Sequence, residues 1–89
     1  MNIIKHITDN MPRVEQVVVE YNGNHYLISS EGPSARYVET LAYMCEPGGK
    51  VLDGIPVAGS YDRTIAEVMV DIMQGNMCMD FDMVKFHGF

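Results

Sequence analysis

The chain has 89 residues, 47% of them hydrophobic and 20% charged, which is the composition of one small globular domain over residues 1–89 and not of a disordered segment. Twelve Asp and Glu oppose six Lys and Arg, so the formal net charge is −6. This charge argues against direct binding to nucleic acid or to an anionic membrane, and it favours a basic protein surface as partner, although it also serves solubility.

The N-terminal segment is interpreted as a short helix over residues 2–10. Ile3, Ile4 and Ile7 recur at helical spacing, and Pro12 ends the run. The segment is too polar for the core of a secretory signal, and no part of the chain is apolar enough for a membrane span. The expected location is therefore the cytoplasm.

Residues 14–30 predict a β-hairpin. Two strand-like runs flank Asn22 and Gly23, a dipeptide that accepts the positive φ angles of a type I′ turn. The resulting register puts one apolar group on a single face, made of Val17, Val19, Tyr21, Tyr26 and Ile28. The other face is mostly polar and is expected to meet solvent or a partner; it carries Gln16, Glu20, His25 and Ser29, with Val18 and Leu27 between them.

Residues 31–34 are expected to form a loop, and the run that follows, ARYVETLAYMC, fits either a helix or a strand. We favour a strand, because the run is rich in Tyr, Val and Thr and because the turn sequence EPGG leads into the strand-like KVLD. A second hairpin over about residues 36–54 follows. Residues 54–60, which include Pro56 and Gly59, are expected to be a loop.

The C-terminal half predicts one helix and one strand. Asp62 is the expected N-cap of a helix that ends before Gly75, and Ile65, Val68 and Ile72 form its apolar stripe. Residues 77–86 alternate in polarity, which is typical of a strand.

The expected fold is α+β: an antiparallel sheet of four to five strands, with the helix that follows Asp62 packed on one face, and a short N-terminal helix. The expected core consists of Val17, Val19, Tyr26, Ile28, Leu41, Ile65, Val68, Met69, Ile72 and Phe81.

The residue types that carry chemistry are scattered. The three histidines, His6, His25 and His87, lie in separate segments without ligand spacing. Cys45 and Cys78 are far apart and are interpreted as buried thiols in a reducing compartment, with a single disulfide as the alternative. No motif around any Ser or Cys indicates a nucleophile. We therefore expect no enzymatic activity, no metal and no cofactor.

The acidic side chains are the candidate partner-binding residues. Glu15, Glu20, Asp80 and Asp82 are hypothesised to mimic a row of phosphates or to meet an arginine-rich surface. Glu15 and Glu20 lie on opposite faces of one strand, so they should not act together, whereas Glu20 lies beside His25. Asp80 and Asp82 form the second cluster; the alternative for this pair is a solvated face or a charged strand edge that resists aggregation.

Four segments in order resemble a group of small uncharacterised proteins of phages and mobile elements. The matching positions are Tyr26 to Ser30, Tyr37 to Tyr43, Gly48 to Asp53, and Tyr61 to Thr64, about half the chain. The sequence departs from that group in the extra Val38 and in Ala42, which replaces a large residue. The resemblance implies a fold and a source rather than an activity.

Small acidic phage proteins are often inhibitors of host defence nucleases, including anti-CRISPR proteins, and the analogy is one of class and size. The leading expectation is accordingly a phage-type inhibitor that binds the basic nucleic-acid channel of a defence nuclease. The alternative is a homo-oligomeric structural or regulatory module, such as a homodimer, joined through strand edges or an apolar patch.

Overall fold

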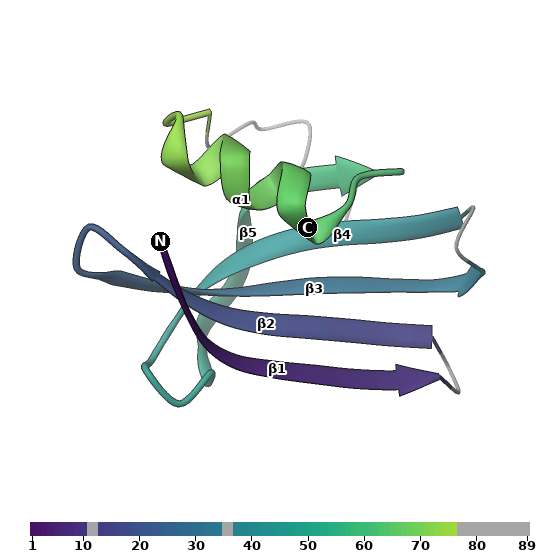
Figure 1. Cartoon of the computed structure of the whole chain (residues 1–89), viewed down its shortest axis with the longest axis horizontal. Helices are drawn as coiled ribbons and strands as arrows, with labels where there is room; N and C mark the ends of the chain where they lie inside the picture. The colour runs from purple at the N-terminus through teal and green to yellow at the C-terminus, as the bar shows by residue number, and fades with distance from the viewer. Residues whose placement is uncertain (11–12, 35–36, 77–89) are drawn as a thin grey trace.

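The strands that are consecutive in the chain are also neighbours in the sheet (Figure 1). The computed structural model describes residues 1–10, 13–34 and 37–76. Those residues form one antiparallel sheet in the order β1-β2-β3-β4-β5, with a single helix, α1, over one face. The elements are β1 (Asn2–Asn10), β2 (Arg13–Tyr21), β3 (Asn24–Ser34), β4 (Tyr37–Cys45), β5 (Val51–Tyr61) and α1 (Ile65–Met73). The α+β class is confirmed.

The hairpin of β2 and β3 has the predicted register. Asn22 and Gly23 both have positive φ, 51° and 81°, as a type I′ turn requires. Val19 pairs with Tyr26, and Val17 pairs with Ile28. Local turn chemistry therefore decides which side chains of these two strands share a face.

The predicted N-terminal helix is wrong, because residues 2–10 form strand β1 along the free edge of β2. Ile3, Ile4, Ile7 and Thr8 are β-branched and pack well on a pleated surface. A lone helix of this length is marginal in water, whereas the strand gains a ladder of backbone hydrogen bonds to β2. The helical spacing of the isoleucines is thus overridden by strand pairing.

Two predicted loops are also wrong, since residues 31–34 continue β3 and residues 54–60 continue β5. The ambiguous run before Cys45 is a strand, as predicted, and pairs with both. Strand β5 tolerates Gly59 and Pro56 because its pairing with β4 is irregular, with register shifts on both sides of Tyr43. The signals that indicated a loop instead mark a bent edge strand.

Helix α1 begins later than predicted, with Thr64 and not Asp62 as its N-cap. The Thr64 hydroxyl accepts from the Glu67 backbone N–H, and the Glu67 carboxylate accepts from the Thr64 N–H, which is a capping box. Gly75, at φ 77°, follows the C-cap, as predicted. The fully buried Thr40 hydroxyl donates to the Arg63 carbonyl and so holds the start of the helix on β4.

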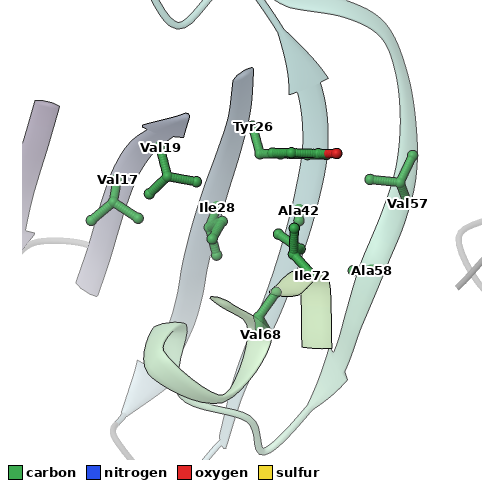
Figure 2. Close-up of a cluster of buried hydrophobic side chains, with 9 residues drawn as sticks. All are labelled: Val17, Val19, Tyr26, Ile28, Ala42, Val57, Ala58, Val68 and Ile72. Atoms are coloured by element: carbon green, nitrogen blue, oxygen red, sulfur yellow. The ribbon is translucent and has the colours of Figure 1, made fainter. Parts of the chain in front are cut away.

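The main core lies between α1 and the sheet (Figure 2). Val68 and Ile72 of the helix pack among the side chains of the strands, with Ile28 and Ala42 beside them. The buried cluster comprises Val17, Val19, Tyr26, Ile28, Ala42, Val57, Ala58, Val68 and Ile72, with Ile65 and Met69 partly buried against it. The predicted core is confirmed at these shared positions. Phe81 and the predicted strand over residues 77–86 lie outside the described residues.

Leu41 is buried as predicted, but on the opposite side of the sheet. Ala42, its neighbour in β4, belongs to the cluster beneath the helix, so the alternation of the strand directs Leu41 away from α1. Its register neighbours are Ser29 and Gly59. The sheet therefore buries side chains on both faces.

Candidate functional site

The candidate site is the sheet face turned away from α1, here called the far face. Strand alternation and register assign to it Gln16, Val18 and Glu20 of β2, His25, Leu27, Ser29 and Glu31 of β3, and Glu39, Leu41, Tyr43 and Cys45 of β4. This face was expected to meet solvent or a partner over much of its area. That expectation is only partly right, because Val18 and Ser29 are 2% and 7% exposed.

The turn between β4 and β5 covers part of the far face. Gly49 in this turn lies so close to Val18 of β2 that an added Cβ would be 3.0 Å from the valine Cγ2. Gly49 has φ 99°, which few side chains tolerate, and the turn is closed by a hydrogen bond from its N–H to the Glu46 carbonyl. The turn shields the middle of the face, while charged side chains lie along both of its ends.

One end of the far face carries Glu31, Glu39 and Tyr61. Together with Tyr43, which lies further along β4 and whose pKa is raised by the charges of both glutamates, they are called the acidic cluster here. Glu31 of β3 and Glu39 of β4 lie directly opposite each other in the register, and Tyr61 of β5 is the next position across the sheet. Side chains in direct opposition on antiparallel strands have Cβ atoms about 4.5–5.5 Å apart. The fold thus holds two carboxylates next to each other.

The two tyrosines respond to the charge of this cluster. Burial raises the pKa of Tyr43, and the negative charges of Glu39 and Glu31 raise that pKa further. Partial burial, a hydrogen bond to the Glu39 carboxylate and the charge of that carboxylate raise the pKa of Tyr61. Both phenols are therefore neutral donors at physiological pH.

A chain of side-chain hydrogen bonds orients Glu31. The Gln16 amide donates to the Ser29 hydroxyl over 3.3 Å, and that hydroxyl donates to Glu31 Oε1 over 3.2 Å. Ser29 is buried and cannot easily rotate away. One carboxylate of the cluster is consequently held in place by the strands behind it.

The other end of the far face carries a row of Glu20, His25 and Cys45, one residue from each of three adjacent strands. Glu20 Oε2 lies 3.5 Å from His25 Nε2, which confirms that these side chains are neighbours. Cys45 is a free, buried thiol, and burial together with the charge of Glu46 raises its pKa. Both causes favour the protonated form of the thiol.

The structure separates the acidic residues that the sequence singled out. Glu15 is on the helix side of the sheet, where its Oε2 lies 3.3 Å from His6 Nε2, whereas Glu20 is on the far face. Their placement on opposite faces is as predicted. Asp80 and Asp82 lie outside the described residues, as do Cys78 and His87. Within the ranges that are described, no three His, Cys, Asp or Glu are grouped closely enough to hold a metal ion.

Sequence reasoning missed the acidic cluster because it ended the strand at Ser30. Glu31 was assigned to a loop, and a loop residue has no register partner. Extending the strand by one residue and pairing it with the next strand would have placed Glu31 opposite Glu39. The available signal was the strand-like character of the sequence before residue 31 and after residue 36.

Comparison of the chain with protein-family models, with curated proteins and with solved structures found no significant match. Over the described residues, no helix has the length and apolar character needed to cross a membrane.

Proposed function

We propose that this chain is a non-enzymatic protein-binding module whose acidic cluster receives basic side chains of a partner. The observation that carries this proposal is the direct opposition of Glu31 and Glu39 on adjacent strands. Like charges at this position oppose pairing of the strands, so a role in stability does not account for them. Two neighbouring carboxylates match the fork of donors on a guanidinium, which binds carboxylates through paired hydrogen bonds.

The electrostatics of the whole chain agree with this assignment. A formal charge of −6 steers a basic surface toward the module and repels nucleic acid. Burial is the main cause of the raised pKa of Tyr43, and the further rise caused by Glu39 and Glu31 is consistent with negative charge at the cluster. The neutral phenols of Tyr43 and Tyr61 add amphipathic surface beside the charges, as is common at protein interfaces.

The resemblance to small phage proteins extends this proposal to a host partner. A nuclease that binds nucleic acid presents a row of Lys and Arg, to which carboxylates can bind in place of phosphates. The extended proposal is an anti-CRISPR-like inhibitor that occupies such a channel in the host cytoplasm. In this role the module needs no cofactor and carries out no chemical step.

A charge-matched pair of variants tests the site. Glu31→Gln/Glu39→Gln removes two charges from the cluster, whereas Glu46→Gln/Asp53→Asn removes two charges from β5 and the turn before it. The probe is a fluorescent nona-arginine peptide, followed by anisotropy at about 0.05 M and about 0.5 M NaCl, between which the Debye length falls severalfold. We expect the cluster variant to bind about tenfold more weakly at low salt, a loss of about 1.4 kcal/mol, and the control variant to lose much less.

Equal weakening by both variants would mean that net charge alone attracts the peptide, and the acidic cluster would then be no site. Failure of the unmodified protein to bind nona-arginine at low salt would likewise contradict the proposal. Binding that persists unchanged at high salt would also contradict it, because contacts of this type weaken as the charges are screened.

A homo-oligomeric role, joined through strand edges, is the second candidate function. The observation that favours it is the exposed outer strand β1, on which residues 2–8 are all exposed. A free strand edge offers unpaired backbone donors and acceptors to another strand.

A further inference from the structure

We propose that β1 pairs antiparallel with β1 of a second copy, about a two-fold axis at Ile7, so that two sheets join into one. This inference deepens the second candidate function and rests on it. It is independent of the acidic cluster, which lies on β3, β4 and β5.

The first observation is the apolar surface of β1. Ile3, Ile4 and Ile7 are 60%, 52% and 41% exposed on an edge strand. Ile3 pairs with Val19 and so lies on the helix side, whereas Ile7 pairs with Gln16 and lies on the far face, so the edge carries an apolar residue on each face. Among the described residues, no other strand pairs with the outer backbone of β1, which makes this edge suited to strand addition.

The second observation is the contrast with β5, the other edge of the sheet. Strand β5 contains Pro56, which has no backbone donor, and Gly54 and Gly59, both at positive φ. Its ladder to β4 is interrupted by two register shifts. Proline and bulges are devices that protect a sheet edge from pairing. Strand β5 has Pro56 and two register shifts, whereas β1 has one register shift, at Ile4, and no proline.

The third observation limits where the axis can lie. Ile4 is an extra residue between the pairs at Ile3 and Lys5, and from Lys5 to Asn10 the register with β2 runs without a break. This regular segment is the part of the edge that can accept another strand. Residues opposite each other in an antiparallel pair share a face, so the axis must lie between two copies of the same residue. Ile7 and Thr8 are the central residues of the regular segment.

The residues that would face each other across the dimer favour an axis at Ile7 rather than at Thr8. An axis at Ile7 sets this isoleucine against its own copy and sets Lys5 opposite position 9 of the other chain, where the sequence has Asp. The Lys5–Asp9 opposition then occurs twice, because the axis repeats it. An axis at Thr8 would instead set Ile7 against Asp9. Within the described part of the chain, no carboxylate lies within 4.0 Å of a Lys5 nitrogen, so this cation is available.

The two-fold axis stands perpendicular to the sheet, so both α1 helices lie on the same side of the joined sheet. The far faces, with their acidic clusters, then share the other side. Six or fewer residue pairs make a short interface, and we expect a weak dimer with a dissociation constant in about the micromolar range.

Sedimentation equilibrium from about 10 µM to about 1 mM tests the dimer, whose mass is twice that of the 10.0 kDa chain. Ile7→Lys brings two cations together at the axis and should give a monomer. Ile55→Lys is the matched control, because Ile55 on β5 is 44% exposed against 41% for Ile7, and it should leave the dimer intact. Circular dichroism and urea unfolding check that each variant is folded.

A charge swap tests the register. Lys5→Glu and Asp9→Lys should each weaken the dimer at least about tenfold, whereas the double variant should restore it, because the opposed charges are exchanged. A chain that stays monomeric at about 1 mM overturns the proposal. Dissociation by Ile55→Lys but not by Ile7→Lys also overturns it, as does a folded double swap that stays monomeric. Lys5 would then be a residue that guards the edge.

The oligomeric state of the Glu31→Gln/Glu39→Gln variant separates the two proposals. An unchanged dimer is expected, because these substitutions are on β3 and β4 whereas the dimer forms through β1. An unmodified protein that is monomeric would therefore contradict the dimer but not the acidic site. An unmodified protein that does not bind nona-arginine would contradict the acidic site but not the dimer.

Discussion

Tyr43 is a reporter of the charge on the far face. Its phenol is neutral in the folded state over a wider pH range than in the unfolded chain, because burial and the carboxylates of Glu39 and Glu31 disfavour the phenolate. The folded-state pKa is raised above the ordinary value of 10.0, so the unfolded chain ionises first as pH rises. The stability contributed by the neutral phenol is present below this pH and is lost as pH rises through the folded pKa.

Replacing one carboxylate should shift this titration. In a Tyr61→Phe background, which removes the other affected phenol, we expect Glu39→Gln to lower the pKa of Tyr43 toward its ordinary value. The shift is measured by NMR titration of the tyrosine Cζ signals, with Glu46→Gln as a control that removes a carboxylate from the turn. An unchanged Tyr43 titration in the Glu39→Gln protein would show that the cluster is not formed as described.

Strand β5 shows how glycine permits a close approach between strands. Gly59 has φ 109°, and a Cβ built on it would lie 2.1 Å from the carbonyl oxygen of Thr40. Gly54 in the same strand has φ 74°, and its Cβ would meet open space. The two glycines thus share an unfavourable φ for other residues but differ in crowding.

Alanine substitutions should separate the two effects. Both variants carry the left-handed backbone cost of about 1–2 kcal/mol. Gly59→Ala should lose about 1–3 kcal/mol more, because the β4 backbone must move. Urea unfolding of the two proteins measures the difference. Equal losses would mean that β5 does not approach β4 as closely at Gly59 as the structure has it.

The packing of α1 on the sheet joins distant parts of the chain into one core. Ile72 is 3% exposed and packs against strands that are far from it in sequence, whereas Val70 on the same helix is 41% exposed. The Tyr21 hydroxyl also donates to the Met73 carbonyl, which ties the end of the helix to β2. The stability of the chain therefore depends on one side of this short helix.

Truncating the buried side of the helix should destabilise the whole molecule. We expect Ile72→Ala to cost about 2–5 kcal/mol through lost burial and the cavity left behind. Val70→Ala should change the free energy of unfolding by about 0.5 kcal/mol or less. Urea denaturation at one pH measures both variants. A loss below about 0.5 kcal/mol for Ile72→Ala would show that the apolar stripe is misassigned.

Local patterns in the sequence were sufficient for the first hairpin and the helix. The Asn22–Gly23 turn specifies its own backbone angles, and these specify the register of β2 and β3. The helix has an apolar stripe of period 3.6 and a glycine beyond its end, so its existence was predictable. Its first residue was not, because Asp62 and Thr64 are both acceptable caps and only Thr64 has Glu67 three residues later.

The fold of the N-terminal segment, the burial of Val18 and the opposition of Glu31 and Glu39 were decided by contacts between segments that are distant in the sequence. Residues 2–10 become a strand because β2 offers a free edge, which the spacing of isoleucines within that segment cannot reveal. Val18 is buried because the β4–β5 turn folds back onto it, although its strand neighbours are polar. Glu31 meets Glu39 because β3 and β4 continue to pair beyond the predicted end of the strand. The periodicity of side chains and the chemistry of turns act over a few residues. The pairing of a strand with a sheet edge, the covering of a sheet face by a turn and the opposition of charges on adjacent strands arise only when separate segments meet.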